Sequence, residues 1–82
     1  MAEPNHEKMR FAICLKHGGY PEALEPLKIY RVLPDLEAAK HGQLRVIDES
    51  GEDYLYFANL FLLVHFPVAV ATALTQAAPL QL

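Results

Sequence analysis

The chain has 82 residues, a formal net charge of -3 and one cysteine, and these totals exclude several classes of protein. A chain this short forms one small domain with a thin core, because it buries only about 60% of its unfolded surface. Cys14 alone allows neither an internal disulfide bond nor a zinc site made of cysteine pairs, and a free thiol fits a reducing cytoplasm. The acidic balance argues against nucleic-acid binding, which normally uses a basic face.

The first element of the domain is expected to be a half-buried strand. In "RFAICLK", residues 10–16, the bulky residues Phe11, Ile13 and Leu15 share one face of an extended chain and small residues share the other. The following stretch, residues 17–26, contains two glycines and two prolines, which is typical of a loop. No signal peptide is expected, because "MAEPNHEKM" before this strand contains no apolar segment.

A second strand and a short helix are expected next. "KIYRVL", residues 28–33, is rich in β-branched and aromatic residues and predicts a strand. In residues 34–42, Asp35 can accept hydrogen bonds from the first turn of a helix, and Gly42 can adopt the left-handed conformation that closes one. Two turns are too short to be stable alone, so this helix is a connector.

The second half of the domain continues as strands and ends in a helix. Residues 44–47 predict a third strand, and a fourth begins at residues 54–56, with "ESGE" as the hairpin turn and a positive φ at Gly51. "FANLF" breaks the alternation, and residues 62–66 predict a further strand. Pro67 fits the first turn of a helix over residues 68–75.

These elements predict a mainly β fold, a small five-stranded barrel with a connector helix and a C-terminal helix. We expect residues 1–9 to be a flexible leader, residues 10–75 to form the single domain, and residues 76–82 to be a frayed tail.

The charged residues are confined to one part of the chain. All seven Lys and Arg and all ten Asp and Glu residues lie between Glu3 and Asp53, which leaves the uncharged segment 54–82. Residues 54–74 approach the length of a membrane-spanning helix, but Asn59, His65 and Pro67 interrupt them and no basic cluster flanks them. Packing against protein, either within the domain or across an interface, is the favoured interpretation.

The surface expected to bind a partner is apolar and lies within this uncharged segment. Its residues are Tyr54, Tyr56, Phe57, Leu60, Phe61, Phe66, Val68, Val70 and Leu74. A second copy of the chain is the first expected partner, since two-fold homodimers are the commonest oligomers, and an unknown partner protein could use the same face.

A family resemblance rests on "YLYFANLFLLV", residues 54–64. This string resembles the segment of Src-homology-3 barrels in which Pro-Ser-Asn-Tyr-Val forms a 3₁₀ turn before the last strand, and Asn59 matches in type. The resemblance implies the barrel fold. It does not imply recognition of polyproline peptides, because Phe57 and Leu60 replace the proline and tyrosine of that groove and the chain has no Trp.

A second likeness covers about half of the chain. The strings "YRVLPD" and "VIDESGEDYLY" are similar to those of a group of small bacterial proteins of unknown function with the same barrel. In that group the position of Phe57 is usually proline and the tail is more charged. This likeness implies a fold and no activity.

The acidic turn and the scattered histidines are the candidates for a chemical site. Asp48, Glu49, Glu52 and Asp53 lack the alternating spacing of a calcium loop, and we interpret them as solvated turn residues. No histidine pair has zinc-ligand spacing, and Cys14 is expected to be buried and inert. We therefore expect no catalytic, cofactor-binding or metal-binding residue.

The sequence thus favours a cytoplasmic protein-interaction or homo-oligomer assembly module that is not an enzyme. The alternative is a small β-barrel that binds single-stranded nucleic acid through Lys28, Arg31 and Arg45 beside Tyr30. The excess of acidic residues makes nucleic acid the less favoured partner.

Overall fold

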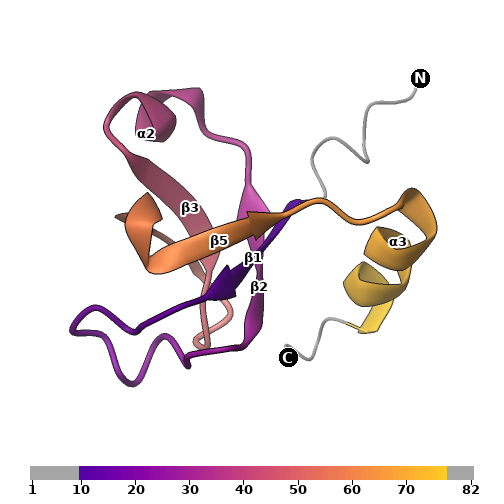
Figure 1. Cartoon of the computed structure of the whole chain (residues 1–82), viewed down its shortest axis with the longest axis horizontal. Coiled ribbons are helices and arrows are strands. Elements are labelled where there is room, and N and C mark those ends of the chain that lie inside the picture. The colour runs from indigo at the N-terminus through magenta and orange to yellow at the C-terminus, as the bar shows by residue number, and fades with distance from the viewer. Residues whose placement is uncertain (1–9, 78–82) are drawn as a thin grey trace.

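In the computed structural model, residues 10–77 are described and form a mainly β domain with one five-stranded antiparallel sheet (Figure 1). The elements are β1 (Arg10–Cys14), β2 (Ile29–Leu33), α2 (Leu36–Lys40), β3 (Gln43–Ile47), β4 (Asp53–Phe57), the 3₁₀ helix η1 (Ala58–Leu60), β5 (Phe61–Val64) and α3 (Val68–Ala77). The predicted order of strands and helices is confirmed. The expected leader lies outside the described residues, as does the tail after residue 77.

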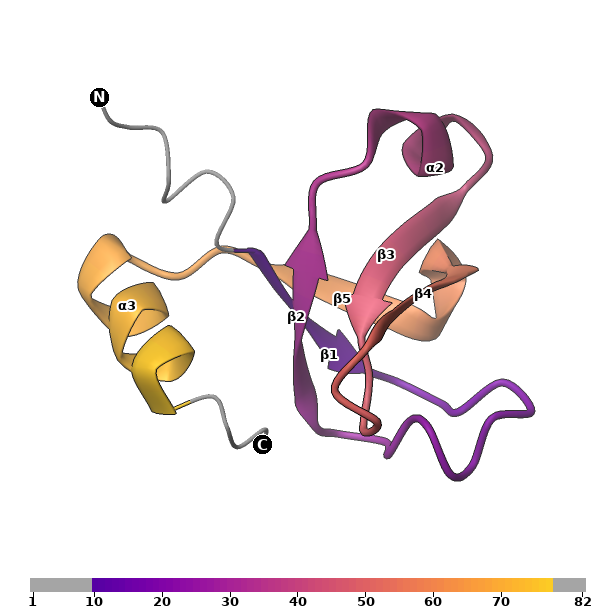
Figure 2. The same cartoon turned by 180° about the vertical axis from the view of Figure 1, so that it is seen from behind.

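The sheet follows the order β4-β3-β2-β1-β5. Neighbours in the chain pair as β1–β2, β2–β3 and β3–β4, and η1 then returns the chain so that β5 pairs with β1. Seen from both sides, the sheet is strongly bent, so that β3 and β4 lie across the molecule from β5 (Figures 1 and 2). Among the described strands no pairing joins β4 to β5. The five predicted strands are confirmed. Closure of the sheet into a barrel is not part of the observed pairing.

The core fills the concave side of this bent sheet. Strand β1 contributes Ala12 and Cys14, both 0% exposed, whereas Ile13 on the other face is only half-buried. On that other face Phe11 is 3% exposed and packs against Phe66, so the bulky residues of this strand do not lie in the cluster on the concave side. The remaining core residues are Leu24, Tyr30, Val32, Val46, Tyr56, Leu60 and Phe61.

Two turns form as their residues predict. The side chain of Asp35 accepts a 2.9 Å hydrogen bond from the N–H of Ala38 in the first turn of α2, and Gly42 ends this helix with φ of 70°. In the β3–β4 hairpin, Gly51 has φ of 86° and its N–H donates to the carbonyl of Asp48 at 2.9 Å. A glycine at each position avoids the strain of a left-handed backbone.

The end of β5 differs from the prediction. The strand ends at Val64 instead of Phe66, because the ring of Phe66 packs edge-on against Phe11 with centroids 5.6 Å apart and Pro67 has no N–H to donate. Helix α3 starts immediately afterwards and lies beside the sheet beyond the end of β5 (Figure 1). It continues through Ala77, so the predicted helix end at residue 75 is two residues short.

In the part of the chain that the structure describes, no helix has the length and apolar character needed to cross a membrane.

Candidate functional site

The uncharged segment is divided between the core and the surface. Three of the residues expected at a partner surface are core residues, with exposed fractions of 5–7%: Tyr56, Leu60 and Phe61. Four are exposed by 42–60%: Tyr54, Phe57, Val68 and Val70. The remaining two, Phe66 and Leu74, are half-buried.

The exposed residues do not form one surface. Tyr54 and Phe57 lie on β4, at the opposite end of the sheet order from β5, which leads into α3 with Val68 and Val70. Because the two groups occupy different ends of the sheet, the predicted partner surface is split. Only the group on α3 adjoins a larger apolar area.

That larger area is the convex side of β2, β1 and β5. Ile29 is the direct cross-strand partner of Ile13, and Ile13 is the partner of Leu62, so the three side chains form one row across three strands. Ile13 points away from the core because its neighbours along β1, Ala12 and Cys14, point into it. Ile29 and Leu62 are its cross-strand partners and therefore lie on the same side of the sheet. Ile29 is 37% exposed and Leu62 is 56% exposed.

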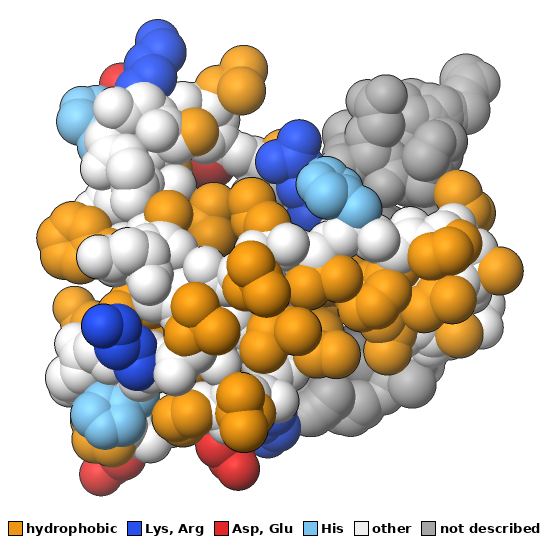
Figure 3. All heavy atoms as spheres, in the orientation of Figure 1, with side chains coloured by type: hydrophobic (Ala, Val, Ile, Leu, Met, Phe, Trp, Pro, Cys, Tyr) orange, Lys and Arg blue, Asp and Glu red, His pale blue; other side chains and the backbone are white. Residues whose placement is uncertain are grey.

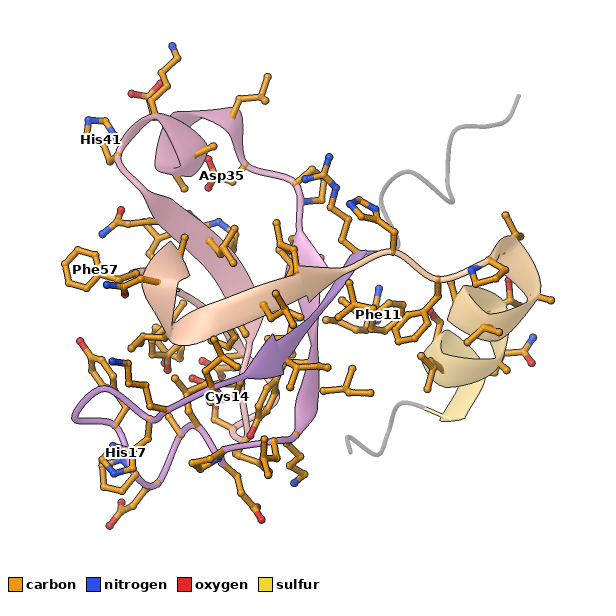
Figure 4. All side chains as sticks on the ribbon, in the orientation of Figure 1. Phe11, Cys14, His17, Asp35, His41 and Phe57 are labelled. Atoms are coloured by element: carbon orange, nitrogen blue, oxygen red, sulfur yellow. The ribbon has the colours of Figure 1, made fainter. Side chains whose placement is uncertain are left out.

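Helix α3 extends this row along the same side of the molecule. In the next cross-strand row Phe11 pairs with Val64 on β5 and with Arg31 on β2, and Phe11 points from β1 toward α3 (Figure 4). A band of apolar side chains therefore runs over β5 and onto α3, with charged side chains at its margins (Figure 3). We call this band the outer apolar face and define it by Ile13, Ile29, Leu62, Val64, Phe66, Val68 and Val70.

Sequence reasoning missed Ile13, Ile29 and Leu62 as surface residues. The available signal was the alternation in β1 and β2, where both faces of each strand carry apolar residues. A strand that is apolar on both faces has a second surface to bury. Which face meets the core depended on side chains from other strands.

The acidic turn is only partly solvated, and the prediction is wrong for Asp48. This carboxylate is 4% exposed. Its Oδ2 accepts a 2.6 Å hydrogen bond from the hydroxyl of Tyr56, and its Oδ1 accepts from the N–H of Ser50 at 2.8 Å and from the Ser50 hydroxyl at 2.6 Å. Burial, together with donation to Asp48, raises the pKa of Tyr56, which therefore stays neutral and keeps donating.

Glu49 joins the turn to the long β1–β2 loop. Its Oε2 accepts hydrogen bonds from Lys28 Nζ at 2.7 Å and from the hydroxyl of Tyr30 at 2.5 Å, and its N–H donates to the carbonyl of Ala23 at 3.0 Å. The hydrogen bond from Lys28, followed by that from Tyr30, lowers the pKa of Glu49. Burial is the main reason that the pKa of Tyr30 is raised. Glu49 is thus a structural anchor.

Two of the three cations of the alternative nucleic-acid platform, Lys28 and Arg45, are held in ion pairs. Lys28 contacts Glu49 and also Glu25, at 3.7 Å. Arg45 bonds through Nε to Asp35 at 2.8 Å and through Nη1 to Asp53 at 2.9 Å. Tyr30, the expected stacking residue, is 5% exposed. The structure therefore does not assemble these side chains into a basic, aromatic surface.

Within residues 10–77, no three His, Cys, Asp or Glu side chains converge in a way that could hold a metal ion. The Cys14 Sγ donates to the carbonyl of Lys16 at 3.3 Å, and burial raises the pKa of this thiol. His65 is exposed, and His6 lies outside the described residues.

Comparisons with protein-family models, with curated proteins and with solved structures find no match to this chain. A functional proposal therefore depends on the geometry of the molecule.

Proposed function

We propose that the protein is a small, non-catalytic assembly module that associates with a second copy of itself through the outer apolar face. The observation that carries this proposal is the row Ile29–Ile13–Leu62, which continues toward α3. Leu62, Val68 and Val70 leave 56%, 52% and 42% of their surfaces exposed. A contiguous apolar face of this kind is uncommon on a monomer and usually marks an interaction site.

The driving force is removal of apolar surface from water. Burial contributes about 25 cal/mol per Å² of apolar area, so several half-exposed aliphatic side chains contribute a few kcal/mol. Association costs at least about 4 kcal/mol in lost translational and rotational freedom. Because each copy buries its own outer apolar face, the apolar contribution counts for both copies, and the proposal requires their sum to exceed this cost. A small domain has a thin core, so a partner that covers the outer apolar face also stabilises the fold.

A second copy is the occupant that the chemistry of the face favours. None of the seven residues that define the outer apolar face carries an ionisable side chain, and Arg31, the β2 partner of Phe11, lies in the next cross-strand row. Charged groups of a partner would be desolvated there without compensation. Another copy offers a matching apolar surface, and a two-fold axis lets the same patch serve both sides.

The fold proposed for the module is a small Src-homology-3-like barrel. The pairing of the first strand with the last and the 3₁₀ helix Ala58–Leu60 directly before β5 support it. The proposal includes a cytoplasmic location, which the single free thiol Cys14 supports. It includes no cofactor.

The test is the molar mass of the purified chain, measured by light scattering over a range of micromolar concentrations. The wild type is expected to be a dimer, and Leu62→Asp is expected to weaken dimerisation by at least about tenfold, since an unpaired carboxylate would be buried. Leu36→Asp is the matched control, because Leu36 is 84% exposed on α2. A monomeric wild type, or equal effects of the two variants, would overturn the proposal.

A further inference from the structure

A pocket of about 560 Å³ lies between the β1–β2 loop, the β3–β4 turn and β4. Its volume falls in the range of small-molecule sites. None of its lining residues belongs to the outer apolar face, so it is a separate feature. The residues that line it are Tyr20, Glu22, Ala23, Asp48, Glu49, Ser50, Tyr54, Leu55 and Tyr56.

The walls of this pocket are aromatic. Tyr20 packs edge-on against Tyr56 with ring centroids 5.1 Å apart, and Tyr20 and Tyr54 leave 48% and 51% of their surfaces exposed. Two half-exposed tyrosine rings therefore line the pocket together with the buried ring of Tyr56. The face of an aromatic ring attracts a cation placed within about 6 Å of its centre.

The charge inside the pocket is negative and only partly balanced. Glu49 is paired with Lys28, but Asp48 is 4% exposed and its hydrogen bonds come from the neutral groups of Ser50 and Tyr56. Glu22 adds an exposed carboxylate at the rim. The pocket is lined by no Lys, Arg or His. A buried carboxylate without a cation favours a positive ligand beside it.

We propose that this pocket binds an organic cation, an ammonium or guanidinium group carried on an apolar stem, such as a lysine or arginine side chain of a peptide. The stem lies against Leu55 and the tyrosine rings, and the cationic head lies toward Asp48 and Glu22. The combination of apolar walls and carboxylates selects against two other classes of ligand, anions and neutral polar molecules.

The experiment is a titration of the ¹⁵N-labelled full chain followed by amide chemical shifts. The probes are the N-acetyl amides of arginine and lysine, with the N-acetyl amide of norleucine as a neutral probe of similar shape and tetramethylammonium as a small quaternary ammonium ion without a long apolar stem. The two cationic amino-acid amides are expected to shift the amides of residues 20–23 and 48–56, with Kd of roughly millimolar strength. Binding of the arginine or lysine probe would support a cation on an apolar stem, and binding of tetramethylammonium alone would overturn that assignment.

Matched variants separate a local site from overall electrostatics. Glu22→Gln and Tyr54→Leu are each expected to weaken binding by about two- to fivefold. Glu37→Gln removes the same charge from exposed α2, outside the pocket, and is expected to have no effect. Leu62→Asp is expected to bind normally, which separates this inference from the proposed dimer.

Shifts that are equal for the neutral and the cationic probes, or no shifts with any cation, would overturn the inference. It would also be overturned by equal losses in Glu22→Gln and Glu37→Gln.

Discussion

The hydroxyl group of Tyr56 donates a 2.6 Å hydrogen bond to Oδ2 of Asp48, and both side chains are buried. Asp48 belongs to the β3–β4 turn, whereas Tyr56 belongs to the core cluster. This contact and the hydrogen bond from the Tyr30 hydroxyl to Glu49 fix the turn to the core, and Ser50 occupies the other carboxylate oxygen of Asp48.

Tyr56→Phe tests this contact. Removing the donor leaves a buried carboxylate oxygen without its partner, so the free energy of unfolding is expected to fall by about 1–3 kcal/mol. Tyr54→Phe is the control, because Tyr54 is 51% exposed and its hydroxyl donates to Glu52, which is also exposed. Its expected change stays within about 0.5 kcal/mol. Urea unfolding measures both, and equal losses would show that the Asp48 contact does not stabilise the fold.

Acid is expected to destabilise the protein through Glu49. The hydrogen bond from Lys28 lowers the pKa of this carboxyl below its ordinary value of 4.5. A lowered pKa in the folded state contributes stability above the unfolded value, and that contribution is lost as the pH falls through the folded value. Asp35 acts in the same direction, because the N–H of Ala38 and then Arg45 lower its pKa below 3.8.

The measurement is thermal unfolding between pH 7 and pH 2 for the wild type and Glu49→Gln. The variant is expected to be less stable at pH 7 and to approach the wild type at the acid end, where Glu49 is neutral. Two parallel curves would rule out a role of the Glu49 charge in the acid sensitivity.

Leu27 offers a stabilising substitution. It has φ of 69° and is 81% exposed, a backbone conformation that costs a non-glycine residue about 1–2 kcal/mol. Asn tolerates this conformation better, so Leu27→Asn is expected to raise the free energy of unfolding by about 0.5–1 kcal/mol. Leu36→Asn, at an equally exposed helical position, is expected to lower it slightly. A loss of stability in Leu27→Asn would contradict the assignment of strain.

Cys14 is expected to resist thiol reagents in the folded protein. It is 0% exposed, and burial raises the pKa of its thiol, so reaction requires an opening of the fold. Its reaction rate with a disulfide reagent should rise with urea in parallel with unfolding. A native rate equal to that of a small free thiol would show that the β1 environment is open.

The sequence predicts the elements well because their signals are local. Asp35 and Gly42 bound the connector helix, Gly51 forms the hairpin turn, and Pro67 precedes α3, each for a reason that lies within a few residues. The break at "FANLF" becomes the 3₁₀ helix before β5 for the same kind of reason.

The parts that could not be predicted depend on contacts between distant residues. Asp48 looks like a solvated turn residue until Tyr56 is placed beside it. The row Ile29–Ile13–Leu62 needs the pairing of β1 with β5, which no local pattern reveals. The sequence does not show whether an apolar residue of the uncharged segment lies in the core or at a surface. The bent sheet places three of them in the core: Tyr56, Leu60 and Phe61.

The most direct test of the proposed assembly is an isotope-filtered NOE measurement on a mixture of ¹³C-labelled and unlabelled chains. It reports only contacts between copies. The proposal predicts NOEs between copies from the methyl groups of Leu62, Val68 and Val70 on the outer apolar face. An absence of such NOEs at millimolar concentration, or NOEs only from β4 residues such as Phe57, would contradict it.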